Sequence, residues 1–412
     1  MILVSHGEIE ANGSEQRRVE FKFPFLTLRT KLFDGFFDRL GAFRFSRLAS
    51  WAALAVVPIV AAIGLYLVIN SLFVLLSNPA VGDVVREAGP GAILLLPGLN
   101  PFLPFVYGWI AIVCAIALHE GAHGVAAGSL GLNVKSSGLL FFLFVPIGAF
   151  VDVDEEQLKK TSGRVASRVM AAGVGGNIAA ASVCLVCVLL IVGGLTPVID
   201  GVYVNEVLQG MPAEAAGLLP KDVIVSVDNV SVNKTADLSV IFENKTAGDI
   251  VPVTVARGDS WQSNFSTAVN LTVSENRTVM GVSVSDLLIG ERLRFYQNVT
   301  LETISLYLIP PSLASGLVPF SDTLVPFYAH WLGPQWHVVT NVLFWLWFVN
   351  VNVAVFNALP IYPMDGGRIF NIALKRLIRG KEREKLVSDI TIAVTAALAL
   401  VLLLTIIIPF IT

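Results

Sequence analysis

The sequence predicts a multi-span α-helical membrane protein of about five to six transmembrane helices, into which a β-rich soluble domain is inserted. Three observations predict this fold class. Of the 412 residues 55% are hydrophobic and only 14% are charged, a balance that excludes an ordinary soluble enzyme. Long apolar runs alternate with basic turns. Residues 196–290 instead alternate β-branched and polar residues between turn signals, as a soluble β-rich domain does.

The first half of the chain predicts a cytoplasmic N-terminal segment and three spans. Residues 1–48 are polar and rich in Lys and Arg, which places them on the cytoplasmic side. The apolar run 49–76 is too long for a signal-peptide core and is expected to be a retained first span. A second span at about 104–130 returns inward, and a third at about 169–195 leads outward, which completes the first part of the membrane domain (49–195).

The stretch 138–151 is apolar but too short to cross a bilayer, and Pro146 and Gly148 interrupt it. We therefore expect a re-entrant or interfacial hairpin. A loop packed on the bilayer surface explains the composition equally well.

The second half predicts a connector and two further spans. Residues 291–335 follow the insert, and their apolar part, 302–329, is interrupted by Pro310, Pro311 and Pro319, so it is expected to be interfacial. A sixth span exists only if this stretch crosses. The second part of the membrane domain (336–412) contains apolar runs at about 338–359 and 387–411, separated by a basic cluster that belongs inside.

Seven asparagines in or just after the insert are each followed two places later by Ser or Thr. This is the acceptor pattern of N-glycosylation, which places the insert on a non-cytoplasmic face, in agreement with the charge rule. The candidates are Asn229, Asn233, Asn244, Asn264, Asn270, Asn276 and Asn298.

Charge and cysteine usage exclude two other classes of protein. A net charge of −3 argues against a nucleic-acid partner. Cys114, Cys184 and Cys187 all lie in apolar runs, which indicates buried thiols and no disulfide framework.

The HEGAH motif (119–123) lies in the second predicted span. On a helix, histidines four residues apart place both imidazoles on one face, where they can chelate one metal ion. In zinc sites of this type Glu120 is not a ligand, but accepts a proton from the attacking water. The bare pattern is only moderately specific. Each ionisable residue in a span costs about 2.5–3.5 kcal/mol to insert, so three in two turns need a local reason, which metal binding supplies.

Asp365 is the candidate third ligand, since catalytic zinc sites use three protein ligands. It follows the fourth span in NALPIYPMDGG (357–367), at the cytoplasmic depth assigned to the histidines. Prolines and glycines break the helix there, and exposed backbone at that depth is tolerable only around a cavity or within protein. A cap of a helix that begins at Gly366 would explain Asp365 equally well in isolation. The matching depth favours the ligand.

With these motifs the sequence resembles the site-2 protease family of intramembrane zinc metalloproteases. HEGAH, NALPIYPMDGG and the AGVGGN segment (172–177) of the third span carry the resemblance, which covers about half of the chain. The resemblance implies one Zn²⁺ per chain, held by His119, His123 and Asp365, with Glu120 as the general base.

The same resemblance implies that 138–151 is a re-entrant β-loop that presents an edge strand to substrate. Gly148 and Phe150 are then substrate-binding candidates. Asn352 and Asn357 resemble polar residues that the family places near the site, where they would hold the substrate backbone.

The insert is similar to a PDZ domain of the protease-associated kind, on the residues from Val204 to Val227. One departure is Pro220-Lys221-Asp222, where such domains commonly have Gly-Asp. Peptide capture by the PDZ-like groove and a size filter both stay open.

The motifs predict an intramembrane zinc metalloprotease that cleaves transmembrane substrates within the lipid bilayer, after a first cut has trimmed them. The alternative is a catalytically inactive membrane adaptor that uses its PDZ-like domain for partner binding, although such a module has no use for the four site residues. The single insert and modest length favour a prokaryotic, archaeal cell membrane, with the N-terminus cytoplasmic and the insert outside.

Overall fold

The computed structural model describes residues 19–30, 35–142, 145–258, 261, 263–274, 277–300, 302–380 and 382–411. The chain divides into two compact units. The membrane unit has the bounds 1–186 and 342–412, and the inserted unit has the bounds 187–341. The inserted unit therefore includes the stretch that the sequence analysis separates as a connector.

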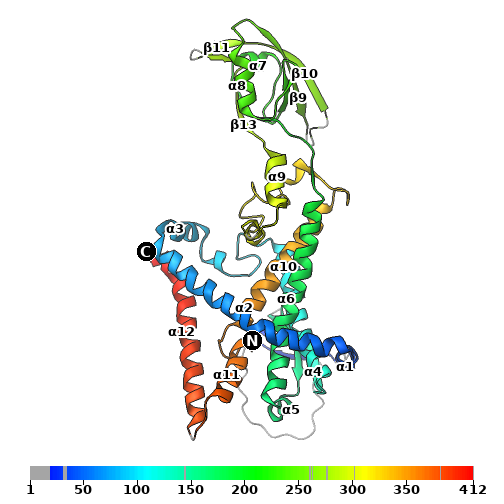
Figure 1. Ribbon diagram of the computed structural model, residues 1–412, viewed down its shortest axis with the longest axis vertical. Helices are drawn as coiled ribbons and strands as arrows, with labels where there is room; N and C mark the ends of the chain where they lie inside the picture. Colours follow the sequence, from blue (N-terminus) through cyan, green and yellow to red (C-terminus); the bar gives the residue numbers. More distant parts are fainter. Residues whose placement is uncertain are drawn as a thin grey trace. The chain divides into compact units, whose positions relative to one another are not determined.

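Five helices among the described residues are long and apolar enough to cross a membrane (Figure 1). They coincide with the five apolar runs of the sequence, so the predicted multi-span architecture is confirmed. In Figure 1, α12 lies beside α2 and α11. The five helices are α2 (Arg44–Ser77), α4 (Phe105–Ser129), α6 (Gly163–Gly193), α10 (Trp336–Ala358) and α12 (Arg383–Ile411); shorter ones are α1 (Phe36–Gly41), α3 (Pro79–Ala88), η1 (Pro90–Ile93), α5 (Glu155–Lys160) and α11 (Asp365–Leu377).

A four-stranded antiparallel sheet lies in the membrane unit, in the order β1-β2-β3-β4. The hairpin of β3 and β4 extends beyond the expected segment at both ends. The N-terminal hairpin pairs with β3, so these residues are part of the sheet rather than a separate polar segment. The strands are β1 (Val19–Lys22), β2 (Phe25–Thr30), β3 (Val134–Phe142) and β4 (Val145–Val153).

The short helix α1 packs directly on α4, one turn beyond the histidine motif. The buried Phe37 side chain lies against Gly124, where a Cβ would come within 2.6 Å of the ring. The backbone of Phe37 lies against Gly128 in the same way, at 2.7 Å. The two glycines, four residues apart on α4, thus form a groove for α1. Any larger side chain at either position would fill it.

The helix α6 packs closely on two neighbours through its glycines. A Cβ at Gly175 would overlap Ala53 of α2, and a Cβ at Gly176 would lie 2.8 Å from the Ala122 side chain of α4. Small buried residues of α2, α6 and α10 fill the same core. Close approach of backbones is the usual way in which helices gain contact inside a bilayer.

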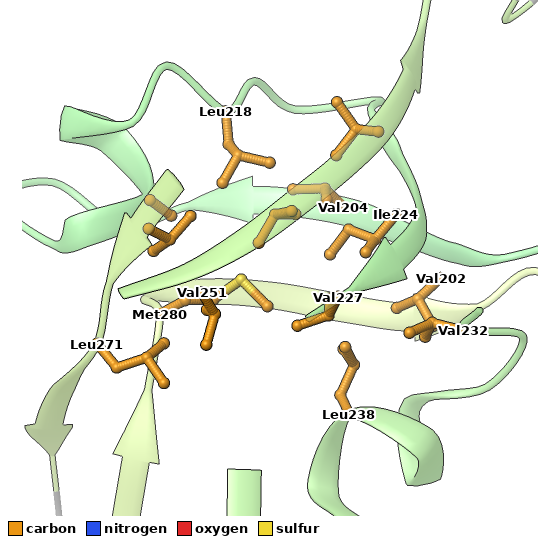
Figure 2. Packing of buried hydrophobic residues seen from close by; sticks show 14 residues of the cluster. Val202, Val204, Leu218, Ile224, Val227, Val232, Leu238, Val251, Leu271 and Met280 are labelled. Atoms are coloured by element: carbon orange, nitrogen blue, oxygen red, sulfur yellow. The ribbon is translucent and has the colours of Figure 1, made fainter. Parts of the chain in front are cut away.

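The inserted unit contains a six-stranded antiparallel sheet in the order β10-β9-β7-β6-β13, with β8 paired to β7. The predicted β-rich insert is confirmed. Alternate residues of the strands point into one apolar core, as the period of two requires; Val251, Val253 and Val255 of β9 all belong to it. Figure 2 shows part of this core, with Val251 labelled. The elements are β6 (Val202–Val207), α7 (Pro212–Ala215), β7 (Val223–Val227), β8 (Val230–Ser231), α8 (Thr235–Glu243), β9 (Ile250–Arg257), β10 (Ser263–Asn270) and β13 (Val282–Asp286).

The stretch 302–329, all of which the structure describes, contains two 3-10 turns and a two-residue strand, with no helix of spanning length. The strand pairs with the start of the inserted unit. The remaining small elements of the inserted unit are β5 (Thr196–Pro197), β11 (Thr272–Ser274), β12 (Arg277–Val279), α9 (Ile289–Gln297), η2 (Thr303–Leu308), η3 (Val325–Phe327) and β14 (Tyr328–Ala329).

Candidate metal centre

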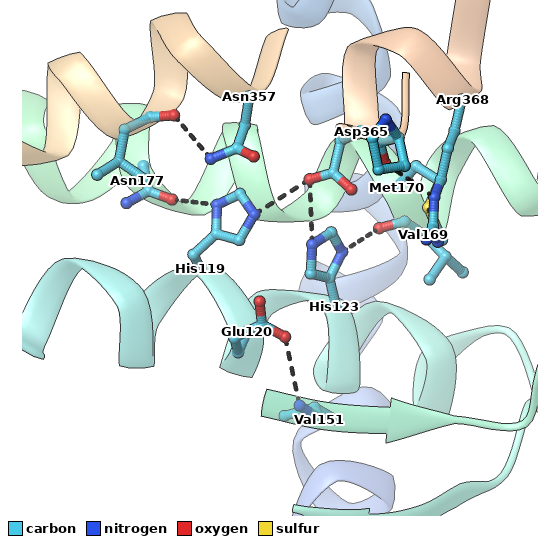
Figure 3. Close-up of polar contacts among 12 residues, drawn as sticks. His119, Glu120, His123, Val151, Val169, Met170, Asn177, Asn357, Asp365 and Arg368 are labelled. Atoms are coloured by element: carbon cyan, nitrogen blue, oxygen red, sulfur yellow. Dashed lines mark hydrogen bonds and ion pairs between the residues drawn. The ribbon is translucent and has the colours of Figure 1, made fainter. Parts of the chain in front are cut away.

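Two histidines of α4 and one aspartate of α11 converge on a single point. The His119 and His123 rings lie one helical turn apart and nearly perpendicular to each other, with centroids 4.9 Å apart. Their Nε2 atoms lie 3.1 Å and 3.2 Å from Oδ2 of Asp365 (Figure 3). All three side chains are buried. Among the described residues this is the only cluster of three or more His, Cys, Asp or Glu whose ligand atoms could hold one ion.

Asp365 reaches the histidines because the chain folds back sharply after α10. It is the first residue of α11. A Cβ at Gly366 would overlap the carbonyl of Ala358, and one at Gly367 would overlap the backbone of Ile361. Only glycine permits so close an approach, so the two glycines after the aspartate set its position.

Two residues of the helix α6 orient the imidazoles by accepting hydrogen bonds from their Nδ1 atoms. Nδ1 of His119 donates to Oδ1 of Asn177 at 2.7 Å, and Nδ1 of His123 donates to the carbonyl of Val169 at 2.7 Å. A carbonyl oxygen only accepts, so the proton of each neutral ring lies on Nδ1. The lone pairs of both Nε2 atoms therefore face Asp365.

The donor set fits a divalent cation. Two imidazole lone pairs and a carboxylate oxygen are all acceptors, and among the described residues Oδ2 of Asp365 has no hydrogen-bond donor. A buried polar atom without a partner is costly, and a cation supplies the partner that all three acceptors lack. Two imidazoles and one carboxylate, each imidazole held by a second hydrogen bond, is the arrangement of catalytic zinc sites.

Gly173 of α6 keeps this point free. A Cβ at Gly173 would lie 2.5 Å from Nε2 of His123 and 2.6 Å from Nε2 of His119. No real Cβ tolerates such contacts, so a side chain here would displace the ligand nitrogens. The sequence marked this glycine only as a residue of close helix packing.

Glu120 lies between the two histidines on α4 and is half-buried. Its Oε2 accepts a hydrogen bond from the backbone N–H of Val151 at 3.3 Å, which links it to β4 (Figure 3). Glu120 therefore lies at the site but is not one of the three convergent ligands.

The strand β4 has a free edge beside Glu120. The N–H of Val151 points at Glu120 and away from β3, and main-chain groups alternate along an antiparallel strand. Ala149 thus offers its N–H and C=O at the free edge, and Val151 offers its C=O, since its N–H is bound to Glu120. The main-chain N–H and C=O groups of Gly148 and Phe150 point the other way, toward β3. The Phe150 ring packs over Gly138.

The two predicted asparagines of α10 lie differently. Asn357 lies beside His119 and Asp365 (Figure 3), and its amide donates to the carbonyl of Val353 at 3.0 Å. Asn352 is five residues earlier, about 140° around the helix, and its amide donates to the carbonyl of Phe348. The structure therefore brings Asn357 to the metal centre and places Asn352 on another face. A third asparagine, Asn350, hydrogen-bonds to Asn177 behind His119 and was missed.

Comparison with known proteins identifies the family. The model of peptidase family M50 matches residues 107–402, which include all of the convergent ligands. The chain belongs to peptidase family M50. The resemblance to site-2 proteases, a membrane metalloprotease family, is thus confirmed.

Individual relatives match different shares of the chain. The uncharacterized protein MJ0971 of Methanocaldococcus jannaschii is 24% identical over 86% of this chain and 79% of its own length. The zinc metalloprotease RasP of Shouchella clausii is 30% identical over 47% of this chain and 48% of its own length. Among solved structures, the PDZ domain of an SdrC-like protein from Listeria monocytogenes is 26% identical, covers 22% of this chain and 93% of that chain, and has a TM-score of 0.20.

Proposed function

We propose that this M50 member is an intramembrane zinc metalloprotease that hydrolyses peptide bonds of transmembrane substrates. The convergence of His119 Nε2, His123 Nε2 and Asp365 Oδ2 at 3.1–3.2 Å, with no proton donor among them, supports it most directly. These three residues would hold the zinc ion. When bound, zinc polarises the scissile carbonyl and lowers the pKa of water at the open fourth position.

Glu120 acts as the general base. Its carboxylate accepts the proton of the attacking water and delivers it to the leaving amine, so one residue serves both halves of the hydrolysis. The hydrogen bond from Val151 holds the carboxylate on the side of β4, where a substrate would lie.

A transmembrane helix hides its peptide carbonyls in hydrogen bonds, so a substrate must unwind locally before cleavage. The free edge of β4 offers main-chain groups to the opened segment, which can add to the sheet as another strand. Asn357, beside the metal ligands, would hold the substrate backbone at the scissile bond. Asn352, Gly148 and Phe150 stay candidates for contacts further along the substrate.

Two variants of the purified full-length protein, compared with the unmutated protein, test this function. With Glu120→Gln we expect bound zinc to be unchanged in elemental analysis, and cleavage of a transmembrane substrate to fall by about 10²- to 10⁴-fold, as loss of a general base does. With His123→Ala we expect both zinc and cleavage to be lost. An inactive adaptor would show no cleavage in the unmutated protein and no change on Glu120→Gln, and this result would refute the proposal.

We also propose that the insert faces the outside of an archaeal cell membrane and carries N-glycans, with the N-terminus in the cytoplasm. The similarity to an archaeal protein supports the origin. Six of the seven candidate asparagines are exposed, as an acceptor must be; Asn276 lies outside the described residues. Mass spectrometry of glycopeptides from the native membrane should find modified peptides from the insert, and unmodified peptides throughout would contradict it.

The substrate class follows from the same topology. A glycosylated insert would exclude substrates with bulky outside domains, so the protease would make the second cut of a sequential release. We expect a trimmed substrate to be cleaved faster than its full-length form by the same preparation. Equal rates would show that the insert imposes no size limit.

A further inference from the structure

A chain of buried amides runs behind the metal centre. Oδ1 of Asn177 accepts from His119, and Nδ2 of Asn177 donates to Oδ1 of Asn350 at 2.9 Å. Nδ2 of Asn350 in turn donates to the carbonyl of Leu346 at 2.7 Å. Both asparagines have no exposed surface. Every bond in the chain therefore points the same way, from the His119 ring to the backbone of α10.

The orientation of the Asn177 amide decides the state of the His119 ring. With Oδ1 toward the ring, Nδ1 carries the proton and Nε2 keeps its lone pair for the metal. If the amide turned over, its NH₂ group would meet Nδ1, and the proton would move to Nε2, where it blocks a ligand position.

Two hydrogen-bond acceptors oppose this rotation of the Asn177 amide, and they differ in strength. The first is the carbonyl of Ala115, which accepts from Nδ2 of Asn177 at 3.1 Å. In α4 that carbonyl also accepts the backbone N–H of His119, four residues later, so it is shared. The second is Oδ1 of Asn350, the side-chain acceptor that meets the other N–H of Asn177. Within the part of the chain that the structure describes, Oδ1 of Asn350 accepts from Asn177 alone, so it is the unshared acceptor.

We propose that Asn350 is a positioning residue for the metal centre, which acts through Asn177 to keep the Nε2 lone pair of His119 available for zinc. The inference deepens the proposed function and rests on it. Outer hydrogen-bond partners of metal-ligating histidines are worth about 10- to 100-fold in metal affinity. Asn350 lies one residue beyond direct contact with the ligand, and its loss leaves a buried N–H of Asn177 unpaired, so the effect should fall in this range.

The experiment uses the full-length protein, labelled with ¹⁵N-histidine and freed of metal. Two-bond ¹H–¹⁵N spectra report which nitrogen of each of the five histidines carries the proton, and His119→Gln assigns the signal. Titration with Zn²⁺ alone gives the affinity. We expect the Nδ1–H form of His119 in the unmutated protein. In Asn350→Leu we expect a mixture with the Nε2–H form and zinc affinity lower by 10- to 100-fold.

Further variants separate positioning from packing. Asn350→Ala removes the same acceptor without new bulk and should behave like the leucine variant. Asn350→Asp keeps an oxygen toward Asn177, and its neutral form can donate to Leu346, so it should restore the Nδ1–H form. Asn341→Leu also removes a buried asparagine of α10, with its bonds to the carbonyls of Phe320 and His337, and should leave both measurements unchanged.

An Asn350→Leu or Asn350→Ala protein that keeps the Nδ1–H form and full zinc affinity would overturn the inference. Because the tautomer is read without metal, this result is independent of the proposed function. Failure of the unmutated protein to bind Zn²⁺ would instead refute the proposed function.

Discussion

The backbone N–H of Val151 donates to Oε2 of Glu120, so the edge strand β4 and the catalytic helix α4 meet at the general base. Proline at position 151 removes this donor while leaving the free edge able to stay extended. We expect Val151→Pro to lower kcat about tenfold, equivalent to roughly 1.4 kcal/mol, with little change in KM. Steady-state cleavage of a trimmed substrate measures both constants.

Ala149→Pro is the matched control for this prediction. It removes the other outward N–H of β4, which faces the free edge without a bond to Glu120. We expect a higher KM and an unchanged kcat. If both proline variants change KM alone, Val151 serves substrate pairing and does not position Glu120.

Gly173→Ala should abolish tight zinc binding. The added Cβ would lie 2.5–2.6 Å from both ligand nitrogens, so α4 and α6 must separate or the rings must turn. We expect zinc affinity to fall on the order of 100-fold, the upper end of what a disturbed outer shell costs. Gly193→Ala, in the last turn of the same helix with open space around its Cβ, should bind zinc normally. Normal affinity in Gly173→Ala would show that the helix shifts freely.

Phe37→Ala should destabilise the membrane unit, because the buried ring packs against Gly124 at the end of the groove that Gly124 and Gly128 form. Removal of a buried phenylalanine costs about 3–5 kcal/mol in protein cores. We expect a thermal midpoint in detergent lower by several degrees and faster proteolysis near α1. The neighbouring Phe36 is 46% exposed, and Phe36→Ala should change neither. Equal effects of the two variants would contradict a specific role of the groove.

Lys221→Gly should stabilise the inserted unit. Lys221 has a φ of +76°, a left-handed conformation that costs an L-residue roughly 1–2 kcal/mol and glycine little. Glycine is more flexible when unfolded, so the net gain should be about 1 kcal/mol. Slower hydrogen exchange in β7 and β9 would measure it. Lys221→Ala keeps the strained conformation and should show no gain; a gain as large as that of glycine would point to the lysine side chain instead.

The same lysine shows why one feature of the sequence was hard to interpret. Pro220-Lys221-Asp222 departs from the usual Gly-Asp, yet the turn keeps the conformation that glycine prefers. Asp222 is held in place by Arg257, whose Nε and Nη2 each donate to its carboxylate at 2.7 Å. This pair is distant in sequence, and no local pattern predicts it.

The long helices and the HEGAH motif could be predicted because apolar length and helical spacing are local properties. The fold-back that brings Asp365 to His119 was inferred from matching depth, and the structure places the two 3.1 Å apart. The pairing of β2 with β3 could not be predicted, since a strand of six residues carries no signal for its partner. The contact of Asn350 with Asn177 depends on how α6 and α10 pack, which one sequence does not reveal.

The order of the four-stranded sheet also bears on the direction in which a bound peptide would run along β4. β2 covers one side of β3, so the edge that meets α4 belongs to β4 alone. A peptide added antiparallel to β4 runs the same way as β3, from the end near Val134 toward the end near Phe142. Its two halves would therefore occupy opposite ends of β4, and photo-crosslinkers on either side of the scissile bond should each label one end. The protein's own N-terminal strands thus cover the far edge of β3 and leave β4 as the strand to which a substrate segment can pair beside Glu120.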